Sequence, residues 1–136
     1  MGSTLNGGCQ CGAVRYRIEG DPISLVACHC KECQRQSGSA FGMSLTVRTT
    51  DFKLTGDVTI YRRTADSGKY VNCAFCPTCG TRVYHEPERM NGLAVNVRAG
   101  TLDDTSALEP VAHAWTRSKQ TWFVLPNGVT QFDKQP

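Results

Sequence analysis

Cysteines dominate the residues of this chain that could do chemistry. Seven of its eight cysteines fall in three short clusters, at Cys9–Cys11, Cys28–Cys33 and Cys76–Cys79. The first and last clusters each hold two cysteines, and the middle one holds three. A closed zinc site takes four protein ligands, whereas a catalytic zinc typically takes three and keeps one position open. The two pairs therefore predict a structural site, and the triple predicts a reactive one.

The two pairs indicate a closed site that joins distant parts of the chain. Cys76 and Cys79 lie two residues apart, and Gly80 can take the backbone conformation that closes such a turn. A redox dithiol is the alternative, but the βαβ context of thioredoxin-like proteins is absent. The knuckle needs a second pair, and Cys9 with Cys11 supplies it. Disulfides are disfavoured, because they are uncommon in the reducing cytosol, which is the expected compartment.

The triple, Cys28, Cys30 and Cys33, predicts thiol chemistry. Three thiolates weaken Zn²⁺ as a Lewis acid, so a soft fourth ligand such as a substrate thiol suits the open position better than water. A metal-bound thiol stays in its nucleophilic thiolate form at neutral pH. The expected reaction is reversible addition of a thiol to a small carbonyl compound. The alternatives are an iron–sulfur cluster, whose usual cysteine spacings do not match, and a site closed by a fourth residue, either Cys73, His29, His85 or His113.

Composition excludes several other classes of function. The longest apolar runs are strand-sized, so no membrane span is expected, and Met1–Asn6 lacks the features of a signal peptide. A cytoplasmic location is the expectation. The net charge of +3 counts every cysteine as neutral. Seven thiolates and two Zn²⁺ ions would bring the charge to about zero, and there is no Lys/Arg run, so no nucleic-acid partner is expected.

The patterning predicts a single mainly β domain over residues 1–136. Alternating or apolar segments bounded by Gly, Asp and Asn predict strands at Val14–Ile18, Ile23–Ala27, Phe41–Val47, Val58–Tyr61, Tyr70–Phe75, Thr81–Tyr84 and Leu93–Val97. One helical turn is expected at Lys31–Gln36, at the end of the triple, and Ser37-Gly38 is expected to stop it. The tail Gln131–Pro136 is expected to be frayed.

The cysteine motifs, in their order along the chain, resemble those of the glutathione-dependent formaldehyde-activating family. The resemblance is carried by Gly8–Gly12, Cys28–Gln34 and Phe75–Thr81, and by a C-terminal stretch from Pro110 to Trp122 that contains His113, Trp115, Ser118 and Lys119. It implies a β-tent fold built from small antiparallel sheets, with two zinc ions per chain. Cys9, Cys11, Cys76 and Cys79 match the structural zinc motif, and Cys28, Cys30 and Cys33 match the catalytic one.

The implied activity is that of a carbon–sulfur lyase of the S-(hydroxymethyl)glutathione synthase type, acting on glutathione and formaldehyde. Gln34, Arg35 and Ser37 follow the triple and are expected to contact the thiol, since carboxylates such as those of glutathione favour arginine donors. His113 is expected to carry a proton near the open position. The alternative function is a non-catalytic zinc module that binds a protein or nucleic acid through two closed sites. A homodimer stays open as the oligomeric state.

Overall fold

The computed structural model describes residues 3–106 and 108–136 and is built mainly from β-strands, which confirms the predicted fold class. None of the helices in these residues is long and apolar enough to cross a membrane. The elements are β1 (Thr4–Gly8), β2 (Arg15–Glu19), β3 (Ser24–Cys28), α1 (Lys31–Ser37), β4 (Gly42–Arg48), β5 (Phe52–Thr55), β6 (Thr59–Thr64), β7 (Tyr70–Phe75), β8 (Arg82–Pro87), β9 (Ala94–Arg98), β10 (Ala112–Ala114) and β11 (Thr130–Gln131), with short 3-10 turns at Thr49–Asp51, Glu88–Met90, Ala99–Thr101 and Thr116–Ser118.

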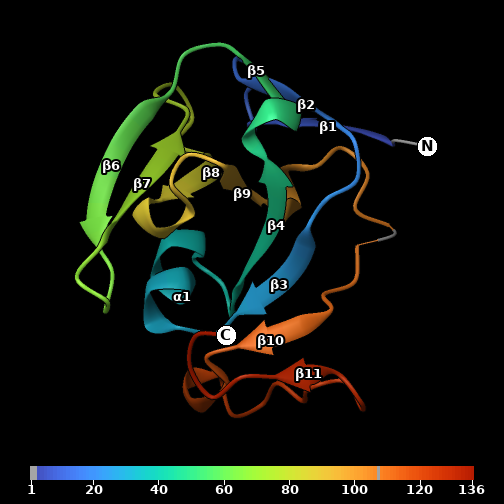
Figure 1. The fold of residues 1–136 in the computed structure, drawn as a ribbon, viewed down its shortest axis with the longest axis vertical. Coiled ribbons are helices and arrows are strands. Elements are labelled where there is room, and N and C mark those ends of the chain that lie inside the picture. Colours follow the sequence, from blue (N-terminus) through green and yellow to red (C-terminus); the bar gives the residue numbers. More distant parts are fainter. Residues whose placement is uncertain (1–2, 107) are drawn as a thin grey trace.

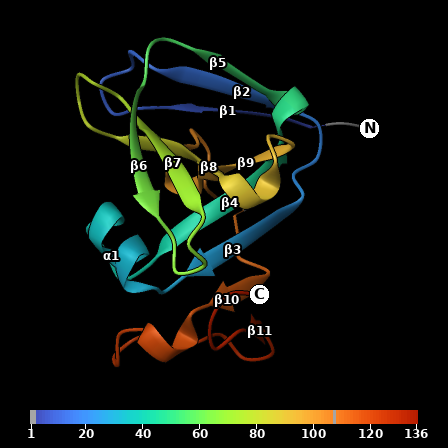
Figure 2. The same ribbon diagram turned by 60° about the vertical axis from the view of Figure 1, so that its left-hand side comes forward.

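The strands form two sheets. The smaller has the order β1-β2-β5, and the larger has the order β11-β10-β3-β4-β9-β8-β7-β6. Pairing is antiparallel throughout, except that β10 runs parallel to both β3 and β11. Figures 1 and 2 show the smaller sheet at one end of the molecule and β10 with β11 at the opposite end. The helix α1 follows β3 directly and packs against β4.

The hydrophobic core lies on one face of the larger sheet. Alternation along β4 and β9 turns apolar side chains to this face, where Leu45 is opposite Val97 and Val47 is opposite Val95. Tyr16 and Ile18 of β2 join them from the smaller sheet, and all of these side chains are buried. The same alternation leaves polar residues on the other face of β4 and β9. Cys9 and Cys76 belong to the core on the apolar face, whereas Cys28 is the register partner of Gly42 on the polar face of β4.

Most strand predictions are confirmed to within one to three residues, and that at Tyr70–Phe75 coincides with β7. The helical turn after the triple is also confirmed, as α1, which ends at Gly38 in the left-handed region (φ 63°). The prediction of a frayed tail was wrong. The backbone N–H of Phe132 donates to the carbonyl of His113 (2.9 Å), and that of Trp115 donates to the carbonyl of Lys134 (3.0 Å). The tail is therefore bound alongside β10.

Candidate metal centres

The structure brings together the four cysteines of the two pairs. The Sγ atoms of Cys9, Cys11, Cys76 and Cys79 all lie within 4.8 Å of one another. Cys11 Sγ is 3.6 Å from Cys9 Sγ and 3.7 Å from Cys76 Sγ. Tetrahedral Zn²⁺ with Zn–S bonds of about 2.3 Å requires sulfurs roughly 3.8 Å apart. The four sulfurs therefore have the spacing of a closed metal site.

Two tight turns shape this four-cysteine group. Gly80, with φ 81°, lets its N–H donate to the carbonyl of Cys76 (2.8 Å) and so closes the second turn. In the first turn the N–H of Val14 donates to Cys9 Sγ (3.2 Å). Hydrogen bonding by Thr81 lowers the pKa of the Cys79 thiol to about 5. Donors aimed at sulfur favour the thiolates that a metal requires.

The group also belongs to the core. Cys76 is fully buried and Cys9 is only 7% exposed, and both pack among the apolar residues between the sheets. The site joins the loop after β1 to the turn between β7 and β8. A metal here would fix the smaller sheet to the larger one, which is the position expected of a structural ion.

The three cysteines of the triple form a second, more accessible group. Their Sγ atoms lie within 4.8 Å of one another, and each residue is half-buried. Cys28 ends β3, while Cys30 is the N-cap of α1 and its sulfur accepts a hydrogen bond from the N–H of Cys33 (3.2 Å). Hydrogen bonds from the thiols of Cys28 and Cys30 hold the pKa of Cys33 well below its ordinary value, and the positive charges of Arg98 and Arg63 add to this effect. The donor set suits a thiophilic ion.

Within residues 3–106 and 108–136, no fourth His, Cys, Asp or Glu places a ligand atom in this three-cysteine group. The proposed rival ligand Cys73 is fully buried in β7, where its thiol contacts the carbonyl of Val71 (3.8 Å). His85 lies opposite Cys73 on β8, and its Nε2 is 3.2 Å from Nη1 of Arg82. Both residues are thus engaged elsewhere on the larger sheet.

The other two rival ligands, His29 and His113, contact each other. His29 Nε2 lies 2.8 Å from His113 Nδ1, and both rings are buried beside Phe41 and Phe123. His113 pairs in register with Ala27, whereas Cys28 pairs with Ala114. Because side chains alternate along a strand, His113 leaves the sheet on the face opposite to Cys28. Burial lowers the pKa of both imidazoles, that of His29 to about 4.

The three residues predicted to contact the thiol lie on α1 but have different surroundings. Gln34 is buried, and its Nε2 donates to the carbonyls of His29 (2.9 Å) and Ser118 (3.0 Å). Arg35 is exposed and lines, together with Gln34 and Gln120, a shallow depression of about 390 Å³. The hydroxyl of Ser37 donates to the carbonyl of Cys33 (2.6 Å). Gln34 thus links the cysteine loop to the C-terminal segment through these two hydrogen bonds. Arg35, in contrast, faces solvent.

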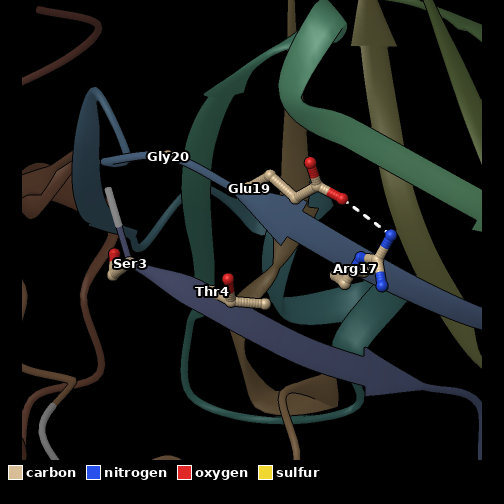
Figure 3. A pocket seen from close by; sticks show the side chains of 5 residues that line it. All are labelled: Ser3, Thr4, Arg17, Glu19 and Gly20. Carbon is tan, nitrogen blue, oxygen red and sulfur yellow. Dashed lines mark ion pairs between the residues drawn. The ribbon is translucent and has the colours of Figure 1, made fainter. Parts of the chain in front are cut away.

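A further depression lies at the edge of the smaller sheet, where Ser3, Thr4, Arg17, Glu19 and Gly20 line it (Figure 3). Nη2 of Arg17 is 2.7 Å from Oε1 of Glu19, so the two charges balance each other. Thr4 begins β1, whereas Cys9 follows its other end. This depression therefore contributes nothing to either cysteine group.

One basic residue beside the three-cysteine group was missed by the sequence analysis. Arg98 ends β9 and is only 7% exposed. In the sequence it follows the apolar run Leu93–Val97 and has the pattern of a solvent-exposed strand end. The signal that reveals it is the strand register, since Arg98 is opposite Ser44 on β4, two residues from the partner of Cys28.

Comparison with known proteins agrees with this geometry. A family model described as glutathione-dependent formaldehyde-activating enzyme matches residues 4–118, a span that contains all of the cysteines. A comparison with curated proteins found no match. Among solved structures, a crystal structure of a Rhodobacter sphaeroides protein matches with 21% identity and a TM-score of 0.58, over 93% of this chain and 98% of that protein. This likeness concerns the fold. The family match establishes that the chain belongs to the glutathione-dependent formaldehyde-activating enzyme family.

Proposed function

We propose that this protein is a zinc-dependent carbon–sulfur lyase that forms and cleaves the adduct between a glutathione-like thiol and a small aldehyde such as formaldehyde. The observation that carries the proposal is the three-cysteine group: three half-buried sulfurs converge within 4.8 Å, in a chain that also holds a separate, complete four-cysteine set. Family membership supports the same reaction. Zinc fits both donor sets, and at the three-cysteine group it would hold the sulfur of the substrate as a thiolate at neutral pH.

The reaction balances without an oxidant or a reductant. The thiolate sulfur donates an electron pair to the carbonyl carbon, the new S–C bond forms, and the carbonyl π pair moves to oxygen, which takes up a proton. In the reverse direction the hydroxyl loses that proton as the S–C bond breaks. The cysteines hold the sulfur at the mouth of β3, and the exposure of this group leaves room for the aldehyde to approach.

The proton carrier and the thiol contacts remain predictions. Because His113 leaves the sheet on the face opposite to Cys28, the role proposed for it runs through His29, whose Nε2 lies 2.8 Å from His113 Nδ1 and which belongs to the cysteine loop. Arg35 and Ser37 are both exposed, and the long side chain of Arg35 can reach a ligand in solution. Gln34 is buried and supports the loop, and the hydroxyl of Ser37 donates to the carbonyl of Cys33. A cytoplasmic location is in keeping with eight cysteines that form no disulfide.

X-ray absorption at the zinc edge tests the proposal directly. Without added thiol, we expect four sulfurs at one metal, and three sulfurs with one light atom at the other. Added glutathione should replace that light atom by sulfur. Four sulfurs at both metals before any thiol is added would favour the non-catalytic module instead.

A variant of the triple tests catalysis. Cys30→Ala should abolish the acceleration of adduct exchange, measured by nuclear magnetic resonance with ¹³C-formaldehyde, and should lower the zinc content from about two to about one while the fold persists. Cys73→Ala, a buried cysteine outside both groups, is the matched control and should keep both metals and the activity. Activity that persists in Cys30→Ala with one zinc remaining would refute the mechanism. His113→Gln should slow exchange without loss of metal.

A further inference from the structure

The polar face of the larger sheet carries an unusual excess of positive charge. Alternation turns one set of side chains away from the core, and a register shift at Ala74/Phe75 brings Arg82 to the same face as His85. The strand register aligns the set across β4, β9, β8 and β6, with Val71 and Cys73 of β7 lying between the last two strands. We call this set the arginine face; it comprises Ser44, Arg63, Arg82, His85, Asn96 and Arg98. The four ion pairs among the described residues involve other arginines, namely Arg15, Arg17, Arg48 and Arg117. The arginines of this face therefore have no carboxylate partner in that part of the chain.

Arg98 is the central member of the arginine face. It is buried, and its Nη1 donates to Ser44 Oγ (2.8 Å). A guanidinium has five N–H donors, and this is the one side-chain hydrogen bond that Arg98 makes within the described residues. A buried charge is unfavourable unless it is paired or fully hydrogen-bonded. Arg98 thus retains donors for an acceptor that comes from outside the chain.

The guanidinium of Arg98 lies close to the three-cysteine group because of Gly42. A Cβ on Gly42 would collide with Nη2 of Arg98 where it now lies, so the glycine leaves space for the guanidinium in this position. Gly42 is the register partner of Cys28. The amide nitrogen of Gln36, on α1, lies 3.2 Å from the same Cβ position and is buried without a hydrogen-bond partner. Two incompletely used donors therefore converge beside Cys28.

The other members of the arginine face add positive charge, and they engage the one nearby imidazole so that it does not accept a hydrogen bond from Arg98. His85 is buried, and burial together with the charges of Arg98, Arg82 and Arg63 lowers its pKa to about 2, so it stays neutral. Its Nε2 accepts a hydrogen bond from Nη1 of Arg82, so this nitrogen does not compete as an acceptor for Arg98. Arg63 lies on the same face as His85, because it pairs with Val71, two residues before the register partner of His85. Three thiolates and one Zn²⁺ carry a net charge of about −1, which one arginine balances, so the second remains available to a ligand.

We propose that Arg98, supported by Arg63 and Gln36, binds a carboxylate of the thiol whose sulfur completes the three-cysteine site. This inference rests on the proposed function and names the chemical class of its thiol, a small carboxylate-bearing one. It assigns the role of recognising the anion to the arginine face of the sheet, rather than to Arg35 on α1.

The test uses two thiols of nearly equal length that differ in charge, 3-mercaptopropionate and 3-mercapto-1-propanol. The protein is loaded with Co²⁺ in place of zinc, and thiol binding is followed by the sulfur-to-cobalt charge-transfer absorption. We expect the carboxylate thiol to bind at least about tenfold more tightly than the alcohol, because hydrogen bonds to a charged group are stronger than those to a neutral one. In Arg98→Met that preference should fall to below about threefold, while binding of the alcohol is unchanged.

Arg62→Met is the matched control. Arg62 is the neighbour of Arg63 on β6 but lies on the opposite face, where its guanidinium is 3.9 Å from the ring centre of Tyr70 and Nε donates to Asn72 (2.8 Å). Its loss should leave the preference intact. If Arg98→Met does not fold, Arg98→Lys and Arg63→Met should each reduce the preference, the lysine variant the less of the two.

The outcomes separate this inference from the proposed function. Equal binding of the two thiols by the unmodified chain, or a preference that survives in every Arg98 and Arg63 variant, would overturn the inference and leave the function standing. If neither thiol changes the cobalt spectrum, the proposed function fails and the inference fails with it. A preference that is lost on replacement of Arg98 and kept on replacement of Arg62 would establish it.

Discussion

Replacement of Cys76 by alanine should destabilise the protein far more than the same replacement at Cys73. Both residues are fully buried, and they lie three positions apart at the end of β7. Each variant loses one sulfur atom from the interior. Cys76, however, belongs to the four-cysteine group and Cys73 to neither group. The difference between the two variants therefore isolates the contribution of the metal from that of packing.

The magnitudes follow from the two environments. Removal of one buried, methyl-sized group costs about 1 kcal/mol, which is the expected effect of Cys73→Ala. A structural zinc contributes about 10–16 kcal/mol through four ligands, so one ligand accounts for roughly 3–4 kcal/mol. Cys76→Ala should thus lose about 4–5 kcal/mol. A domain of 136 residues has a total stability of roughly 7–20 kcal/mol, so this variant should lose between about a fifth and about two thirds of it.

Urea unfolding followed by tryptophan fluorescence gives the free energy of unfolding by linear extrapolation, and a colorimetric chelator assay gives the zinc content. Cys76→Ala should also lose most of its response to a strong chelator, since the ion that the chelator removes is already weakly held. A difference in free energy of less than about 1 kcal/mol between the two variants, with zinc retained in both, would refute the assignment of the four-cysteine group as the structural site.

Two further predictions concern side chains outside the metal ligands. The buried His85 has a folded-state pKa of about 2 against an ordinary 6.5. Its contribution to stability is therefore complete above pH 6.5 and declines as the pH falls below that value. His85→Gln should reduce the loss of unfolding free energy between pH 6.5 and 5, and an unchanged pH dependence would contradict this assignment. Gln34→Ala removes the hydrogen bonds to the carbonyls of His29 and Ser118, so it should cost about 1–3 kcal/mol of stability and speed amide hydrogen exchange at Trp115 and Phe132. Gln120→Ala, which loses a single 3.4 Å contact with Gln34, should have little effect. Equal exchange rates in the two variants would contradict the role of Gln34 in holding the C-terminal segment.

Local patterns explain why much of the fold could be predicted. The alternation of Val14–Ile18 and the apolar run of Ile23–Ala27 each indicate a strand without any knowledge of its neighbours. Helix α1 was predictable because Gly38 provides a clear stop. The strand β1, with its two terminal glycines, carries no such alternation and was missed. The tail Gln131–Pro136 was misjudged because its polar composition conceals backbone hydrogen bonds to β10.

The candidate sites likewise contain residues that local sequence predicts and residues that only the sheet order brings together. Cysteine spacing predicted both ligand groups, because the residues of each motif are close in sequence and few partners were available. Spacing could not place Arg98 and Arg63, which lie on strands separated by β7 and β8 and come to one face only through the sheet order. Nor could it show that His113 and Cys28 leave the sheet on opposite faces, which depends on the pairing of β10 with β3.

The separation of the cysteines along the chain has a consequence for the order of metal capture. The triple lies within six residues, so it can gather an ion as soon as this segment leaves the ribosome. The four-cysteine group links Cys11 to Cys76, which are 65 positions apart, and cannot close until the turn after β7, with Cys76 and Cys79, has been synthesised. In the interval Cys9 and Cys11 have only the triple as nearby thiolate partners. Premature binding across these clusters would produce a kinetic trap, so the timing of metal delivery bears on the yield of native protein as well as on its stability.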